Sequence, residues 1–163
     1  MDQNTITIRY AVHDDLESLV SLLQVLFALE EDFTPDEERQ ARGLRWFLDG
    51  CGKHRTILVA ESDRRVVGMA TIQIVISTAK GGPVGLVEDV VIDEQYRNRG
   101  VGRRLMVALT QWAMDRELSR LQLLADSKNR PALGFYGAMG WEKTQLICLR
   151  NRLGRERHAK NEN

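Results

Sequence analysis

The 163-residue sequence is poor in cysteine and carries no net charge, and each feature excludes a class of protein. Its two cysteines, Cys51 and Cys148, lie far apart in a long chain, so a disulfide-stabilised secreted scaffold is excluded and both thiols are expected to be free. Lys plus Arg and Asp plus Glu both total 23, which argues against a dedicated nucleic-acid-binding protein. We therefore predict no nucleic-acid partner.

Long apolar runs and clustered metal ligands are also missing. No stretch approaches the roughly 20 apolar residues of a membrane-spanning helix, and residues 1–4 do not begin the basic and apolar pattern of a secretion signal. The three histidines are scattered, and neither cysteine has a histidine at zinc-ligand spacing. These absences predict a cytoplasmic protein with no membrane partner and no metal site.

The chain length suits a single domain, because domains of roughly 150 residues are common and no linker or repeat interrupts the sequence. A hydrophobic content of 43% is that of an ordinary globular protein with a sizeable core. We predict one domain over residues 1–163, in which residues 155–163 form a disordered polar tail.

The most informative segment runs from an apolar strand through a glycine-containing turn into a helix. Residues 86–92 are apolar and β-branched except for two adjacent carboxylates, which indicates a buried strand. Gly100 and Gly102 begin an amphipathic helix, where backbone N–H groups have no internal partner. Such a turn can bind an anion, and glycine lets a phosphate approach the backbone. The positive charge needed for a pyrophosphate is supplied nearby by Arg97, Arg99, Arg103 and Arg104.

Two other phosphate-binding patterns can be compared with the same residues. A Walker loop needs the sequence Gly-x-x-x-x-Gly-Lys-(Ser/Thr), which does not occur. A dinucleotide-binding fingerprint needs a glycine three residues after Gly102, where Leu105 lies. An ordinary strand-to-helix turn with solvated arginines stays open for this segment taken alone.

The pattern Arg97-x-x-Gly100-x-Gly102 after a strand resembles the Gln/Arg-x-x-Gly-x-Gly/Ala motif of the GNAT superfamily of acetyl-CoA-dependent N-acetyltransferases. A downstream segment is similar to the family's later Asn-x-x-Ala-(Ile/Leu)-x-(Leu/Phe)-Tyr-x-x-x-Gly-Phe motif, with tryptophan in the last place. Its matching residues are Asn129, Ala132, Leu133, Phe135, Tyr136, Gly140 and Trp141. Because both motifs occur in the family's order, the sequence is identified as a member of this superfamily.

The hydrophobic patterns predict a mixed α/β sheet rather than an alternating βαβ series. The expected elements are strands over 5–10, 56–61, 66–76, up to Ile92, 121–125 and a final pair within 141–149, and helices over 16–30, 35–50, 101–117 and from 131. An Asp14–Glu17 capping box is expected to start the first helix. The resemblance implies a GNAT-like acyltransferase fold: a mixed, mostly antiparallel central sheet of about seven strands with four helices. Its central strands, here those ending near Ile92 and Ala125, would be splayed at the cofactor site.

The resemblance also implies how acetyl-CoA, the acetyl donor, would be bound. Backbone amides from Asn98 to Arg103 would hold the pyrophosphate, while the backbone of Val90 and Ile92 would pair with the pantetheine arm like an added strand. The side chain of Asn129 would form a hydrogen bond with that arm. The full predicted set is Val90, Val91, Ile92, Arg97, Asn98, Arg99, Gly100, Val101, Gly102, Arg103, Asn129, Ala132, Phe135 and Tyr136.

Two residues are candidates for proton transfer. Adjacent residues of a strand point to opposite faces unless a bulge intervenes, so Glu88 and Asp89 are not expected to share a face. Glu88 alternates in phase with Val90 and is the predicted general base, with a salt bridge or binding of the acceptor's cation as the open alternatives. Tyr136 matches the family's usual general acid, because a phenol with a pKa near ~10 can protonate a thiolate. An aromatic residue that only packs a short helix is the alternative.

The acceptor site is predicted from the acidic junction between the first two helices. The family places this junction and the 77–85 loop beside the acceptor, and carboxylates next to aromatics suit a cationic amine. A solvated acidic junction without a ligand explains the same residues. The predicted substrate-binding residues are Phe27, Glu30, Glu31, Phe33 and Glu88.

These observations predict an N-acetyltransferase that moves an acetyl group directly from acetyl-CoA to a primary amine of a small cationic metabolite. A protein N-terminal or lysine acetyltransferase is the first alternative. A non-catalytic acyl-CoA-binding module is the second, and the presence of Glu88 and Tyr136 favours an enzyme over it. The partner is expected to be a small-molecule amine, and a homodimer and a monomer are both compatible with the sequence.

Overall fold

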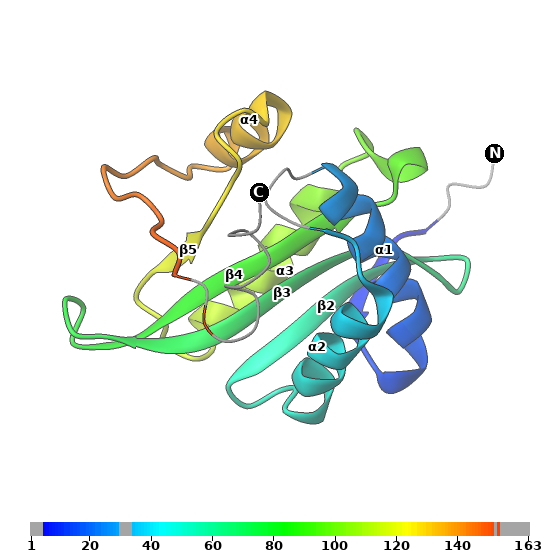
Figure 1. The fold of residues 1–163 in the computed structure, drawn as a ribbon, viewed down its shortest axis with the longest axis horizontal. Helices are drawn as coiled ribbons and strands as arrows, with labels where there is room; N and C mark the ends of the chain where they lie inside the picture. Colours follow the sequence, from blue (N-terminus) through cyan, green and yellow to red (C-terminus); the bar gives the residue numbers. More distant parts are fainter. Residues whose placement is uncertain (1–4, 30–33, 152, 154–163) are drawn as a thin grey trace, which may run out of the picture. The chain divides into compact units, whose positions relative to one another are not determined.

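The computed structural model describes residues 5–29, 34–151 and 153, which fall into two compact units, 1–126 and 127–163 (Figure 1). The predicted tail over residues 155–163 lies outside the described residues, and the single domain over residues 1–163 stays a prediction.

The first unit is built on a five-stranded sheet with the order β1-β2-β3-β4-β5. Neighbouring strands are antiparallel except for β4 and β5, which run parallel. The strands are β1 (Thr7–Tyr10), β2 (Arg55–Ser62), β3 (Arg65–Ser77), β4 (Gly82–Ile92) and β5 (Leu121–Leu123). The predicted mixed, mostly antiparallel α/β sheet is therefore confirmed.

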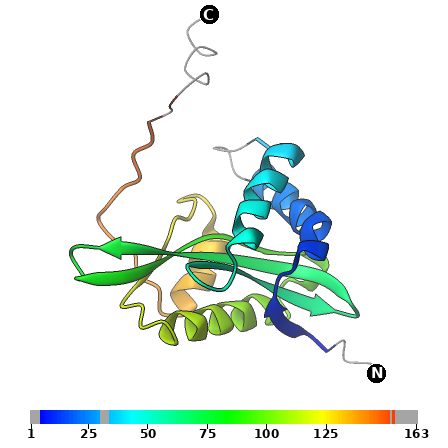
Figure 2. The ribbon, with the colours of Figure 1, turned by 90° about the horizontal axis from the view of Figure 1, so that it is seen from below.

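Helices cover both faces of this sheet (Figure 2). On one face lie α1 (Leu16–Leu29) and α2 (Glu37–Asp49), and on the other lies α3 (Val101–Met114). Leu19, Leu22 and Leu44 of the first two helices pack with Met69 and Val91 of the sheet in one buried cluster. Two short 3-10 turns, η1 (His13–Asp15) and η2 (Glu94–Tyr96), precede α1 and α3. With α4 (Arg130–Ala138) in the second unit, the described residues contain four α-helices, as predicted.

The number of strands differs from the prediction. About seven were expected, but the described residues form five, and the segment 141–149 contains no strand. Leu146 and Leu149 are each 86% exposed. The segment whose alternation predicted a strand is not paired with another strand among the described residues of the second unit. A strand needs a neighbouring strand for its backbone groups, which a sequence pattern cannot supply.

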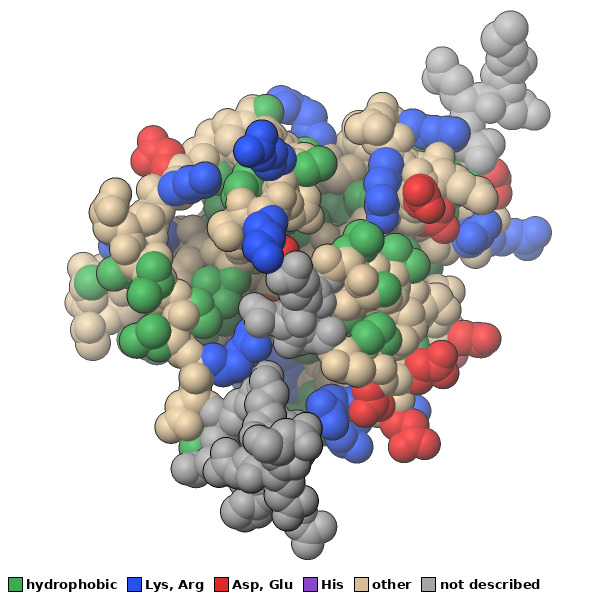
Figure 3. Space-filling view, turned by 45° about the horizontal axis from the view of Figure 1, so that its top comes forward, with side chains coloured by type: hydrophobic (Ala, Val, Ile, Leu, Met, Phe, Trp, Pro, Cys, Tyr) green, Lys and Arg blue, Asp and Glu red, His purple; other side chains and the backbone are tan. Residues whose placement is uncertain are grey.

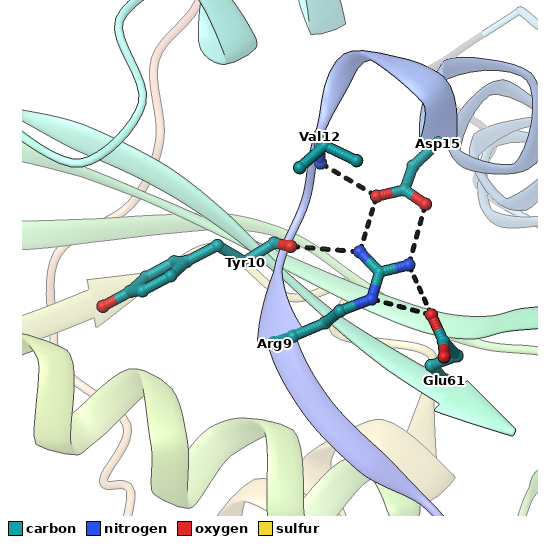
Figure 4. A network of polar contacts seen from close by, with 5 residues as sticks. All are labelled: Arg9, Tyr10, Val12, Asp15 and Glu61. Atoms are coloured by element: carbon teal, nitrogen blue, oxygen red, sulfur yellow. Dashed lines mark hydrogen bonds and ion pairs between the residues drawn. The ribbon is translucent and has the colours of Figure 1, made fainter. Parts of the chain in front are cut away.

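The start of α1 is held by an ion-pair network of Arg9, Asp15 and Glu61 (Figure 4). The Arg9 guanidinium donates two hydrogen bonds to Asp15, at 2.8 and 2.9 Å, and its Nε donates to Glu61 at 2.7 Å. Asp15 also accepts from the Val12 N–H at 2.8 Å. The predicted Asp14–Glu17 capping box is therefore wrong: the carboxylate that caps this helix start belongs to Asp15, whose position beside Arg9 depends on the strand pairing of β1.

Replacing Asp15 with asparagine is expected to lower the free energy of unfolding by about 2 kcal/mol at neutral pH, because Arg9 loses its bidentate partner. Hydrogen bonds from Arg9 hold the pKa of Asp15 below its ordinary value of 3.8. The carboxylate therefore stabilises the fold above about pH 4, and this contribution is lost as the pH falls through the lower folded-state pKa. Urea unfolding of both proteins between pH 3 and 7 checks this. The exposed Asp14→Asn is the control, and an equal loss in both variants would contradict the assignment.

Candidate functional site

The two central parallel strands part at their carboxyl ends. The ladder between β4 and β5 consists of Gly85–Leu121, Leu86–Gln122 and Val87–Leu123, whereas β4 continues to Ile92. From Glu88 onward, this edge of β4 has no strand beside it in the described part of the first unit. The predicted splay between the two strands is thus present, although β5 ends at Leu123 and not at Ala125. The edge offers backbone N–H and C=O groups to an extended ligand.

The strand carries an irregularity at the two adjacent carboxylates. Ala70 of β3 pairs with Val90, but Ile72 pairs with Val87, so Thr71 alone lies opposite Glu88 and Asp89. One additional residue on β4 is a β-bulge.

The bulge changes the predicted faces of β4. Val87 and Val90 lie on the same face of the sheet, and the two carboxylate residues between them lie opposite Thr71 on the α1/α2 face. The prediction that Glu88 alternates in phase with Val90 and Ile92 is therefore wrong, because the bulge shifts the alternation by one residue. Glu88 is exposed and Asp89 is half-buried. Thr71 was missed, although a threonine within the apolar run 66–76 is the signal that marks it.

The turn after β4 is fixed by side chains at its base. The Asp93 N–H donates to the Val67 carbonyl at 2.8 Å, and its carboxylate accepts from the Gln95 N–H at 2.9 Å. The same carboxylate pairs with Arg65 at 3.2 Å, which ties the turn to the β2–β3 hairpin. The turn that leads to α3 therefore starts from a fixed position on the sheet.

The backbone of the turn adopts the left-handed conformation twice before α3 begins. Asn98 has a φ of 58° and Gly100, the N-cap of α3, a φ of 77°. Gly100 offers no capping side chain, and the first helical hydrogen bond runs from the Arg104 N–H to its carbonyl at 3.1 Å. The N–H groups of Val101, Gly102 and Arg103 thus lie in the first turn, where a helix provides no acceptor. Such N–H groups can bind an anion, and binding of a pyrophosphate here stays a prediction.

The four arginines around this turn make different contacts. Arg97 donates from Nε to the Ile92 carbonyl at 3.1 Å, and Arg104 donates to the Ile6 carbonyl at 2.6 Å, so both are engaged with backbone. The Arg99 guanidinium lies 5.6 Å from the centre of the Tyr96 ring, and Arg103 is exposed on the first turn of α3. Arg99 and Arg103 are therefore better placed than the other two to contact an anion.

Packing of α3 against the sheet fixes where this turn lies relative to β4. Val101, Leu105 and Leu109 are at most 1% exposed. A Cβ on Gly68 would lie 2.7 Å from Cδ1 of Ile92 and 3.2 Å from Cδ1 of Leu105, so a larger residue here would displace the ends of these two side chains. The helix start is consequently held next to the end of β4.

In the second unit, the predicted residues of the later motif lie together on α4. The Asn129 side-chain oxygen accepts from the Ala132 N–H at 3.1 Å and caps the helix. The Tyr136 ring is 5.2 Å from the Phe135 ring and 5.8 Å from the Trp141 ring, measured between centres. The Trp141 N–H also donates to the Tyr136 carbonyl at 3.0 Å. Tyr136 therefore belongs to a local packing unit and is also a candidate proton donor.

The predicted acceptor residues next to α1 lie only partly within the described residues. Phe27 is half-buried and packs against the cluster beneath α1, whereas Glu30, Glu31 and Phe33 lie outside the described residues. The acidic run continues into α2, where Asp36 caps the helix by accepting from the Arg39 N–H at 3.0 Å. This carboxylate therefore has a structural role.

Acidic side chains gather toward the right of Figure 3, the side on which α1 and α2 lie in Figure 1. A groove between these helices is lined by Glu17, Glu37 and Glu38 together with Arg42 and Arg45. Because the arginines offset the acids and Glu88 does not line it, this groove is not assigned to the acceptor.

Residues 5–29, 34–151 and 153 contain neither a candidate metal centre nor a candidate membrane span. In this part of the chain, no group of three or more metal-ligating side chains comes together. No helix within it is long and apolar enough to cross a membrane.

A profile of the Acetyltransferase (GNAT) family matches residues 18–141, which include both the β4–α3 turn and the later motif. The chain belongs to the GNAT acetyltransferase family. An uncharacterized N-acetyltransferase from Methanocaldococcus jannaschii is 24% identical over 146 residues, which cover 88% of this chain and 63% of that protein. Glucosamine 6-phosphate N-acetyltransferase from Trypanosoma brucei brucei is 35% identical over 78 residues, which cover 47% and 51%. The chain thus spans less than two thirds of the length of these curated relatives.

The fold of this GNAT protein is shared with solved structures. An aminoglycoside N-acetyltransferase in complex with CoA superposes with a TM-score of 0.78 at 19% identity, over 93% of this chain and 97% of that chain. At this identity the likeness shows the fold alone, and it confirms the predicted GNAT architecture.

Proposed function

We propose that this protein transfers an acetyl group from acetyl-CoA to a primary amine of a small cationic molecule. The observation that carries the proposal is the continuous path from the open edge of β4 to the start of α3. An extended arm can pair with that edge, and a pyrophosphate can accept from the N–H groups of Val101, Gly102 and Arg103. The residues present therefore fit the amide-containing arm of the donor and its pyrophosphate.

Each step of acetyl transfer has a candidate among the residues of the chain. Acetyl-CoA supplies an activated acetyl group: the amine nitrogen bonds to the thioester carbon, and the carbon–sulfur bond breaks. A backbone N–H at Val90 would stabilise the negative charge that develops on the carbonyl oxygen. Glu88 would take the amine proton through water, and Tyr136 would protonate the departing thiolate and regain its proton from solvent. Arg99 and Arg103 would offset the charge of the phosphates.

The acceptor class rests on charge and on the relatives. Glu30, Glu31 and Asp32 follow Phe27 in the sequence, so a cationic amine would find carboxylates and an aromatic surface. The names of two similar proteins specify glucosamine 6-phosphate and an aminoglycoside, both of which carry amino groups on sugars. An amino sugar, a polyamine or an amino acid is therefore the acceptor that we propose.

The proposal is tested by following thiol release from acetyl-CoA in the presence of a panel of amines. Turnover is expected with small cationic amines, and raising the ionic strength should increase the acceptor KM if the site is open to solvent. Peptides with a free N-terminus or a lysine form the second arm of the panel. Turnover only with the peptides would replace the small-molecule acceptor with a protein. Tight acetyl-CoA binding without turnover by any amine would indicate a non-catalytic binding module.

A further inference from the structure

The bulge in β4 is held by a side chain of β3. Thr71 is fully buried, and its Oγ1 accepts a hydrogen bond from the Asp89 N–H at 3.0 Å. The same hydroxyl lies 3.4 Å from Asp89 Oδ2, to which it donates. Because the bulge takes this N–H out of the regular ladder, the hydroxyl provides the acceptor that a buried backbone donor requires.

Core packing alone does not explain a threonine at this place. Its neighbours along β3, Met69, Ala70 and Ile72, are fully buried and apolar, and valine has nearly the shape of threonine. A buried hydroxyl is unfavourable unless it is hydrogen-bonded, and here both its donor and its acceptor capacity are used. The hydroxyl therefore serves the bulge and not the core.

The bulge determines where the proposed base lies. With regular alternation, Glu88 and Asp89 would point to opposite faces of the sheet. The register around Thr71 instead puts both on the face that carries Met69 and Val91. If the bulge moved one residue toward the start of β4, Val87 and Glu88 would lie opposite Ile72 and Glu88 would turn toward the face covered by α3.

We propose that Thr71 is a positioning residue for acetyl transfer: its hydroxyl fixes the β4 bulge in the register that presents Glu88 to the acceptor. This inference rests on the proposed function, because Thr71 acts through the proposed base. Thr71 itself is buried and takes no part in the chemistry. The effect of removing its hydroxyl should therefore appear in kcat and not in the KM for acetyl-CoA.

The test compares Thr71→Val with Thr56→Val. Thr56 is a second fully buried threonine, one strand away, whose hydroxyl contacts Cys51 Sγ at 3.2 Å. We expect Thr71→Val to lower kcat about tenfold while the KM for acetyl-CoA stays within twofold, and Thr56→Val to change neither. Thr71→Ser keeps the hydroxyl and should restore kcat. An unchanged kcat in folded Thr71→Val would overturn the proposal.

A double-mutant cycle asks whether Thr71 acts through Glu88. In the background of Glu88→Gln, Thr71→Val should lower kcat by less than twofold, because no base is left to position. A further tenfold loss in that background would show that Thr71 acts elsewhere, and would overturn the proposal.

Hydrogen exchange of the Asp89 amide separates this inference from the proposed function. Thr71→Val should speed that exchange at least tenfold relative to Thr56→Val, whether or not any amine is acetylated. An unchanged exchange rate would overturn the role of Thr71, whereas absent turnover in the parent protein would overturn the proposed function. If Thr71→Val does not fold, Thr71→Ser and Thr71→Cys replace it. A thiol sulfur is a weaker hydrogen-bond acceptor than a hydroxyl oxygen. The Asp89 amide should therefore exchange faster in Thr71→Cys than in Thr71→Ser.

Discussion

Replacing Tyr136 with phenylalanine is expected to lower kcat about a hundredfold and to leave the affinity for acetyl-CoA unchanged. General acid catalysis typically contributes 10²–10⁴-fold, and the substitution removes only the proton donor. The ring keeps its contacts with Phe135 and Trp141, at 5.2 and 5.8 Å between centres, so the packing of α4 should persist. A loss confined to kcat would then report the hydroxyl.

The measurement is thiol release under single-turnover conditions, so that product release does not mask the chemical step. Tyr10→Phe is the matched control, because Tyr10 is an exposed tyrosine on β1 and loses the same hydroxyl. Its rate should equal that of the parent protein. Equal single-turnover rates for Tyr136→Phe and the parent would instead make Tyr136 a packing residue of the second unit.

The segment from β4 to α3 could be predicted because its structure is determined locally. An apolar β-branched run, a turn with Gly100 and an amphipathic helix each carry a sequence pattern that depends on few distant residues. The β2–β3 hairpin is similar: Asp63 and Arg64 have φ values of 48° and 62°, the left-handed pair of a two-residue turn. Both elements formed where the pattern placed them.

The features that the sequence did not predict depend on register between strands. Regular alternation predicted the sheet face on which Glu88 lies. Only the position of Thr71 opposite both Glu88 and Asp89 shows that the alternation fails there. Likewise, Asp15 became the capping carboxylate because β1 places Arg9 beside it, six residues earlier in the chain. Sequence periodicity describes one element at a time, whereas a bulge or an ion pair arises between elements.

The arginines illustrate the same limit for the candidate site. Four cations near the turn suggested that all could face phosphates, but Arg97 and Arg104 are used to bind the carbonyls of Ile92 and Ile6. Backbone carbonyls that need donors are not visible in a sequence pattern. Counting the arginines therefore does not show which guanidinium groups contact the protein's own backbone.

Gly102→Val is expected to weaken acetyl-CoA binding about a hundredfold. Gly102 is the second residue of α3, so a branched side chain there would lie among the N–H groups that we propose for the pyrophosphate. Losing one or two charge-assisted hydrogen bonds costs about 3 kcal/mol, which corresponds to that factor. The helix itself should not suffer, because valine has a higher helix propensity than glycine.

Calorimetric titration with acetyl-CoA measures this effect, and Gly43→Val provides the matched control. Gly43 lies within α2, and a Cβ there would meet no atom within 4 Å, so the same substitution should leave donor affinity unchanged. Gly102→Ala should show an intermediate loss, since one methyl group obstructs less space than a branched side chain. If Gly102→Val folds with the thermal stability of the parent protein and binds acetyl-CoA equally tightly, the pyrophosphate does not bind at the start of α3. The open edge of β4 would then have to hold the donor by its arm alone.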